Sequence, residues 1–208
     1  MSNVTAQKLK PRSPMSRHHP TLKGFADPAA LGLGAFAVST FLLSFANAGI
    51  VPAAAPAVLG VALFYGGIAQ VISGLWEFVR GNTFGAAAFV SYGSFWLAYW
   101  WMQTNPELAK EIGGSGFGMY MITWTIFTGL LTVITTRINM MLFLLYATAT
   151  VTFLTLGLSA FTGEAWLQHV GGWFGLASSA AAWYGFFAAM LNSTLERVVL
   201  PLGIVGNP

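Results

Sequence analysis

Long stretches without any charged side chain constrain this chain more than any other feature of its sequence. Between Asp27 and Glu196 only seven further residues are charged, and the charge-free intervals are 28–76, 81–106, 112–136, 138–163 and 165–195. A helix needs about 20 apolar residues to cross roughly 30 Å of hydrocarbon. Each of the last four intervals accommodates one such helix, and the first, which two prolines interrupt, accommodates two. The sequence therefore predicts an all-α integral membrane protein with six transmembrane helices.

The expected organisation has three parts. Residues 1–26 are expected to form a disordered basic cytoplasmic tail, residues 27–200 the transmembrane domain, and residues 201–208 a short C-terminal tail. The longest connection is expected at Gln103–Gly116. The six spans are expected at about 31–50, 57–78, 84–102, 117–136, 139–160 and 170–191.

Composition excludes several classes of function. Charged residues make up 7% of the chain, whereas soluble domains contain about 25%. Cysteine is absent, which excludes disulfides, thiolate catalysis and cysteine metal sites, and the three histidines show no metal-ligand spacing. The sequence contains no catalytic triad pattern, HExxH motif or phosphate-binding glycine loop. We therefore expect neither an enzyme nor a bound metal or cofactor.

The distribution of Lys and Arg predicts the orientation in the membrane. The N-terminal tail, with five, would share one side with Arg80, Arg137 and Arg197, and the other side would hold only Lys110. This bias places both termini in the cytoplasm of a plasma or inner-membrane protein, as an even number of spans also requires. The net charge of +3 then reflects topology, and no nucleic-acid partner is expected because no aromatic–basic patch accompanies it.

Uncharged polar side chains recur within the expected spans, and no charged residue lies at the centre of one. The absence of central charges disfavours a pump with a carboxylate relay. Some hydroxyls are explained by hydrogen bonds within or between helices, and the excess fits a narrow path for a small solute with an aromatic constriction. The polar sets are Ser39, Thr40, Ser44 and Asn47; Gln70 and Ser73; Tyr92, Trp96 and Tyr99; Thr125, Thr128 and Thr132; and Thr148, Thr152 and Thr155.

The segment Gly81–Gly85 is the densest local pattern. Asn82 and Thr83 are expected to cap the third span, and Glu77 and Arg80 are spaced to form an ion pair at the end of the second. Capping is compatible with lining a vestibule, because the amides at a helix N-terminus favour anions.

Several segments resemble the signature of the acetate uptake transporters, the succinate–acetate permease family. They are Phe64–Gln70, Gly74–Phe78, Gly81–Gly85 and Ser91–Trp96. The opening motif of that family, Asn-Pro-Ala-Pro-Leu-Gly-Leu, resembles Asp27–Leu33, with Asp27 and Ala30 as departures. The resemblance covers about residues 25–203.

This resemblance implies a six-helix protomer that assembles as a homo-hexamer, with a separate path in each subunit for acetate, succinate or other short carboxylates. Movement would be channel-like or linked to protons. The family's hydrophobic constriction maps to Phe36, Tyr92 and, near a position where bacterial relatives tend to have Leu, Ala149. A smaller side chain there would widen the constriction, and Asp27 would place a negative charge near the cytoplasmic mouth. The candidate substrate-binding residues are Gln70, Asn82, Thr83, Asn47, Thr148 and Ala182.

The chemistry of acetate agrees with an uncharged path. Its carboxyl pKa is close to that of Glu, about 4.3, so the anion dominates at neutral pH. Burying a bare anion is very costly, and passage needs donors at the mouths, such as Gln70, Asn82, Thr83 and Tyr92, or protonation before the constriction. We expect the substrate itself to carry the proton. Two alternatives remain open: a path for another small solute such as ammonia, urea or formate, and a non-transporting sensor or assembly protein.

Overall fold

Local sequence signals set where the helices begin and end in the computed structural model, which describes residues 26–203. Asp27 caps the first helix by accepting from the Ala29 amide at 3.0 Å, and Pro28 occupies its first turn. Asn139 caps another helix through the Leu142 amide at 2.8 Å. The elements are α1 (Pro28–Asn47), α2 (Ala54–Leu63), the π-helix η1 (Phe64–Ala69), α3 (Gln70–Arg80), α4 (Thr83–Thr104), α5 (Pro106–Thr135), α6 (Met140–Thr162) and α7 (Ala165–Thr194).

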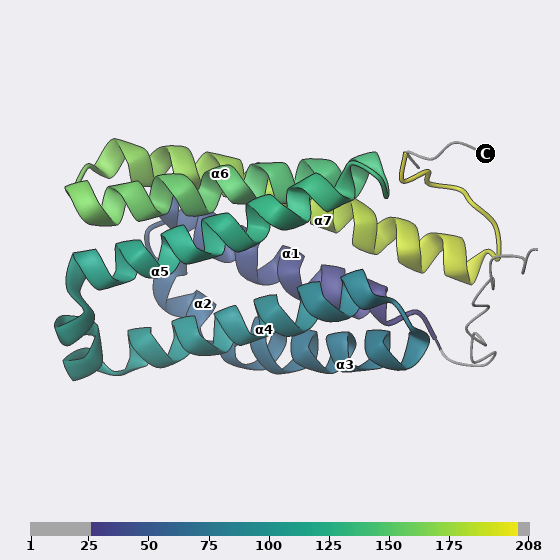
Figure 1. Cartoon of the computed structure of the whole chain (residues 1–208), viewed down its shortest axis with the longest axis horizontal. Coiled ribbons are helices and arrows are strands. Elements are labelled where there is room, and N and C mark those ends of the chain that lie inside the picture. The colour runs from purple at the N-terminus through teal and green to yellow at the C-terminus, as the bar shows by residue number, and fades with distance from the viewer. Residues whose placement is uncertain (1–25, 204–208) are drawn as a thin grey trace, which may run out of the picture.

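The helices lie roughly parallel to one long axis, and both ends of the described chain lie at the same end of the bundle (Figure 1). The expected tail at residues 1–25 lies outside the described residues. α2, η1 and α3 run on without a break from Ala54 to Arg80. In sequence order the chain thus traverses the bundle repeatedly from end to end.

Five helical stretches of the described chain are long and apolar enough to cross a membrane: α1, the α2–η1–α3 unit, α5, α6 and α7. α4 is 22 residues long and free of charge, but its Trp, Tyr and Ser residues make it less apolar. Much of α4 is buried inside the bundle, where those side chains contact protein. The prediction of an all-α membrane fold is confirmed.

One expected connection is wrong. Gln103–Gly116 was predicted as a loop, but α5 begins at Pro106 and continues to Thr135. Pro106 favours the first turn of a helix, and Gly113, with φ 56° and ψ −170°, introduces a kink that separates the first turns from the rest. The bend is visible at the left end of α5 in Figure 1.

Helix packing leaves α4 and the middle of α1 in the interior. α1 packs on α7, α5 on α6, α6 on α7, and α3 on α4. The approach of α1 and α7 is so close that a Cβ on Gly172 would lie 2.1 Å from the Ala48 amide nitrogen. Small residues allow such contacts between membrane helices, which no hydrophobic force drives together.

Candidate functional site

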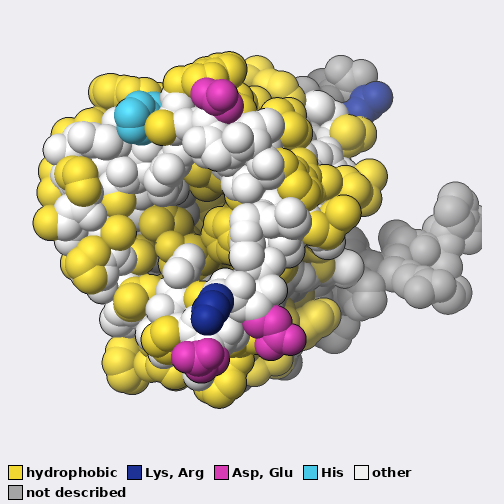
Figure 2. All heavy atoms as spheres, turned by 90° about the vertical axis from the view of Figure 1, so that its left-hand side faces the viewer, with side chains coloured by type: hydrophobic (Ala, Val, Ile, Leu, Met, Phe, Trp, Pro, Cys, Tyr) yellow, Lys and Arg dark blue, Asp and Glu magenta, His cyan; other side chains and the backbone are white. Residues whose placement is uncertain are grey.

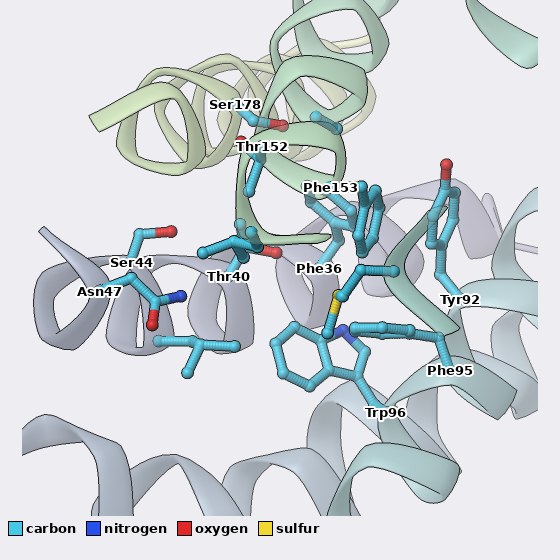
Figure 3. Close-up of a pocket in the computed structure, with 14 residues that line it drawn as sticks. Phe36, Thr40, Ser44, Asn47, Tyr92, Phe95, Trp96, Thr152, Phe153 and Ser178 are labelled. Carbon is cyan, nitrogen blue, oxygen red and sulfur yellow. The ribbon is translucent and has the colours of Figure 1, made fainter. Parts of the chain in front are cut away.

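An internal cavity lies between α1, α4, α5, α6 and α7 (Figure 3). It offers about 40 Å³ to the centres of water molecules, and one water needs about 10–15 Å³ of such space. The cavity therefore holds about three waters or a solute of similar size. It is lined by Phe36, Thr40, Leu43, Ser44, Asn47, Tyr92, Phe95, Trp96, Met121, Ala149, Thr152, Phe153, Leu156 and Ser178.

The three residues predicted to form the constriction line this one cavity, although they come from three helices. Phe36, Tyr92 and Ala149 are 5%, 1% and 3% exposed. The rings of Phe36 and Tyr92 meet edge to face with centroids 5.6 Å apart. Tyr92 is also stacked on Phe153 of α6, at 6.5 Å and an interplanar angle of 4°. We call Phe36, Tyr92 and Ala149 the neck.

The Tyr92 hydroxyl has a partner that the sequence did not indicate. It lies 2.8 Å from the Thr128 hydroxyl of α5, and Thr128 is not part of the cavity lining. The ring of Tyr92 therefore lines the cavity while its hydroxyl is occupied elsewhere. This differs from the expectation that Tyr92 donates a hydrogen bond to a solute.

Hydroxyl and amide groups of the cavity fall into two classes. Thr152 donates to the Thr148 carbonyl at 3.0 Å and Ser178 to the Leu145 carbonyl at 2.9 Å, so their protons are already used. The hydroxyls of Thr40 and Ser44 and the amide Nδ2 of Asn47 have no acceptor among the described residues. These three groups belong to α1, and the indole N–H of Trp96 on α4, which also lines the cavity, has no acceptor among the described residues either. Figure 3 shows Ser44 and Asn47 at the end of the cavity away from Tyr92.

We call Thr40, Ser44 and Asn47 the donor track. Sequence reasoning singled out Asn47 as a site residue but treated Thr40 and Ser44 only as polar residues of the first span. The spacing of Phe36, Thr40, Ser44 and Asn47, in steps of three or four, places them on one helical face and was the signal for the whole set.

A wider vestibule of about 770 Å³ adjoins the cavity. The two spaces share Leu43, Asn47, Met121 and Leu156. The vestibule is formed by the C-terminal ends of α1, α4 and α6 and the start of α7, and none of its lining residues is charged. Figure 2 shows the hollow in this end of the bundle, which is opposite the two ends of the described chain. In the vestibule Gln168 donates to Asn47 Oδ1 at 3.3 Å.

The remaining sequence candidates lie away from the cavity. Gln70 is fully buried on α3, and neither of its amide atoms has a partner among the described residues. Thr148 bonds the Leu144 carbonyl of its own helix at 2.6 Å, and Ala182 is fully buried in the core. Asn82 and Thr83 lie exposed at the start of α4, at the end opposite the vestibule.

Asn82 caps α4, as the sequence predicted. Its Oδ1 accepts from the Gly85 amide at 3.1 Å, and Gly81 just before it has a φ of 77°, which ends α3 in the left-handed region. A Cβ on Gly85 would lie 2.5 Å from Asn82 Nδ2 and 3.0 Å from Glu77 Cδ, so a larger residue there would displace these two side chains. The pattern Gly81–Gly85 is thus explained by a tight turn between α3 and α4.

The predicted ion pair between Glu77 and Arg80 is wrong. Arg80 pairs with Asp27, whose carboxylate is half exposed at the start of α1, whereas Glu77 is 1% exposed and turned inward. Asp27 therefore caps a helix and neutralises Arg80, and its charge is not left unpaired at a mouth. Within residues 26–203 no group of three or more His, Cys, Asp or Glu residues could hold a metal ion.

Comparison with known proteins agrees with this architecture. A family model described as the GPR1/FUN34/yaaH family matches residues 7–204. The chain is 40% identical over 192 residues to a Saccharomyces cerevisiae protein named ammonia transport outward protein 2, covering 88% of this chain and 68% of that one. It is 38% identical over 180 residues to the Escherichia coli succinate-acetate/proton symporter SatP, covering 86% and 95%.

A solved structure, titled as that of the bacterial acetate channel SatP, superposes with a TM-score of 0.82 at 38% identity and covers 86% of this chain and 99% of that one. Sequence and structure therefore agree over nearly the whole helical bundle, and they support a multi-pass membrane protein. The chain belongs to the GPR1/FUN34/yaaH family.

Proposed function

We propose that this chain provides a path for acetate and related short carboxylates, succinate among them, across the plasma or inner membrane. The observation that carries the proposal is the donor track of Thr40, Ser44 and Asn47, which leads from the vestibule to the neck. Carboxylate oxygens accept hydrogen bonds and need donors, and these donors are free because no protein acceptor occupies them. The names of the bacterial relative and of the similar solved structure, a symporter and a channel of acetate, support the same substrate.

The path imposes a sequence of energetic steps on a carboxylate. In the wide vestibule the anion keeps its water, and along the donor track hydroxyl and amide groups replace part of that water. At the neck, two aromatic rings and Ala149 offer no donor, and burying a bare anion there is very costly. No charged side chain lines the cavity to supply a proton, so the substrate passes the neck as the neutral acid and carries the proton itself.

Ammonium or ammonia is the second candidate solute, because the yeast relative bears the name of an ammonia transporter. The hydroxyl oxygens of Thr40 and Ser44 can accept from an ammonium ion as well as donate to a carboxylate, whereas Asn47 Nδ2 only donates. Formate, like acetate, offers a carboxylate, and urea offers both N–H donors and a carbonyl acceptor. Competition by each unlabelled solute against labelled acetate in one flux assay distinguishes these alternatives.

For the arrangement in the membrane, we infer six crossings with α4 as the sixth, both termini in the cytoplasm, and a homo-hexamer with one path per subunit. The even number of crossings agrees with both described ends lying at one end of the bundle. Because the chain has no cysteine, single cysteines at Ala26 and Ala165 report topology directly. An impermeant thiol reagent added outside cells should label only the cysteine at 165, and native mass spectrometry should give six copies.

The decisive test is uptake of labelled acetate into proteoliposomes, with and without an imposed inward proton gradient. Protein-free liposomes, measured in parallel, give the leak of acetic acid through lipid. Accumulation above equilibrium that follows the gradient establishes proton-linked transport, and gradient-independent equilibration establishes a channel. Uptake no faster than in protein-free liposomes refutes the proposed function.

A further inference from the structure

Thr128 differs from every other threonine of α5. Thr123, Thr125, Thr132 and Thr135 each donate a hydrogen bond to a carbonyl of their own helix, at 2.7–3.0 Å. This is the usual arrangement for hydroxyls in membrane helices. Thr128 makes no such bond, and its hydroxyl lies 2.8 Å from the Tyr92 hydroxyl of α4. The hydroxyl of Thr128 thus acts only between helices, whereas that of Thr132 donates within α5 and also lies 3.0 Å from the Thr150 hydroxyl of α6.

The pair formed by Tyr92 and Thr128 is fully enclosed. The two residues are 1% and 0% exposed, and no other hydrogen-bond partner is available to either hydroxyl within residues 26–203. Water cannot replace a missing partner at such a site, so loss of one hydroxyl leaves the other unsatisfied. The geometry of Tyr92 therefore depends on Thr128.

Few hydrogen bonds join α4 to α5. Among the described residues two hydrogen bonds join these helices, the pair of Tyr92 with Thr128 and the bond from the Tyr120 hydroxyl to the Phe95 carbonyl at 3.0 Å. The Tyr92 ring also contacts aromatic rings of α1, α5 and α6, including Phe36 across the neck. Ring-to-ring contacts of this kind tolerate several orientations, whereas the hydroxyl pair selects one.

We propose that Thr128 is the positioning residue of the neck: its hydroxyl fixes the Tyr92 ring and thereby sets the largest carboxylate that passes. This inference rests on the proposed function, since it concerns the size of the carboxylate. Thr128 itself does not touch the cavity. It acts through the hydroxyl at the end of the Tyr92 ring.

The variant Thr128→Val keeps the shape of the side chain and removes the hydroxyl. Packing alone then orients the Tyr92 ring, and the neck should discriminate less between small and large acids. We expect the ratio of acetate to succinate uptake rates to fall about fivefold, which is the typical effect of one neutral hydrogen bond on an equilibrium. Thr128→Ser keeps a hydroxyl in place and should restore most of the ratio.

The matched control is Thr135→Val. Thr135 is also fully buried on α5, but its hydroxyl donates to the Thr132 carbonyl of its own helix at 2.7 Å. It should leave the acetate-to-succinate ratio unchanged, whereas a general loosening of α5 would alter the ratio in both variants. Tyr92→Phe removes the same bond from the other side and should lower the ratio as Thr128→Val does. The double variant should be no worse than either single one.

All variants are measured as proteoliposomes after size-exclusion chromatography has shown normal assembly. An unchanged ratio in Thr128→Val, or an equal change in Thr135→Val, overturns the proposal. If Thr128→Val does not assemble, the comparison of Tyr92→Phe with Thr128→Ser decides, because only the first lacks the bond. Failure of the wild-type protein to move any carboxylate refutes the proposed function, whereas normal acetate uptake with an unchanged ratio in the variants refutes the role of Thr128 alone.

Discussion

The donor track makes a quantitative prediction at Asn47, the residue shared by the vestibule and the cavity. Its Oδ1 is held by Gln168 at 3.3 Å, which leaves Nδ2 free to donate to a carboxylate. Asn47→Leu removes this donor with little change in size. A hydrogen bond to a charged group contributes about 1.5–3 kcal/mol, which corresponds to roughly 10- to 150-fold in affinity. Asn47 is partly exposed to the vestibule, so we expect the lower end of this range.

The assay is the initial rate of labelled acetate uptake over a series of concentrations at constant pH and salt. The half-saturating concentration should rise about tenfold in Asn47→Leu, while the maximal rate changes much less, because the neck is untouched. A higher half-saturating concentration with a similar maximal rate indicates that the protein binds the solute more weakly before the rate-limiting step. Gln168→Leu is the control: it removes the neighbour of Asn47 but no cavity donor, and it should raise the half-saturating concentration by less than about threefold. An unchanged value in a correctly assembled Asn47→Leu protein would refute the assignment of the donor track.

Three further substitutions probe the neck and the start of α1. Ala149→Leu adds three carbon atoms to a cavity that holds about three waters, and it should depress succinate uptake more than acetate uptake, as a ratio of initial rates shows. Phe36→Ala removes a ring that is 5% exposed and should admit larger carboxylates; retained selectivity in competition assays would place Phe36 outside the path. Asp27→Asn keeps a capping side chain but breaks the half-exposed ion pair with Arg80. It should destabilise the protein by no more than about 1 kcal/mol in thermal unfolding and leave acetate uptake within about twofold, and a larger loss of uptake would show that Asp27 acts on the solute.

The membrane class of this fold was predictable because charged side chains are expensive in hydrocarbon, so their spacing marks the helices. The start of α5 was missed for the same reason. Glu107, Lys110 and Glu111 read as a polar connection, yet with Leu108 and Ala109 they form a run of strong helix formers after Pro106. Charge indicates where a helix leaves the hydrocarbon, and the helix itself continues beyond that point.

Gln70 shows why the polar residues of a span cannot be assigned to a path from periodicity alone. The π-helix over Phe64–Ala69 shifts the rotation of α3 relative to α2, so the faces of the two segments do not continue one another. Gln70 lies immediately after this shift and is buried outside the cavity lining. Nothing in the local sequence fixes how far such a shift turns the following side chains.

The threonines of α5 show a similar limit. Thr125, Thr128 and Thr132 share one face of the helix, as their spacing predicted, but only Thr128 lies opposite a tyrosine hydroxyl of α4. Which threonine meets the hydroxyl of a neighbouring helix depends on how the two helices are aligned along their axes. The packing of the whole bundle sets this alignment. The family resemblance predicted that Phe36, just after the motif Asp27–Leu33, and Tyr92, within Ser91–Trp96, share one site, and their rings do meet; their role as a constriction stays a prediction.

The arrangement of polar groups in the cavity itself favours one kind of solute. Hydroxyls on α6 and α7 donate to backbone carbonyls, so both these hydroxyl protons and those carbonyls are already engaged. The unoccupied donors are the Thr40 and Ser44 hydroxyls and Asn47 Nδ2 of α1 and the indole N–H of Trp96 of α4. A carboxylate, which offers only acceptors, can accept from all of these donors, whereas an ammonium ion can donate to the hydroxyl oxygens but gains nothing from the N–H groups. In the path that we propose, the donor track and the aromatic neck act in series: the carboxylate binds along the first, and it crosses the second as the neutral acid, because burying a bare anion there is very costly.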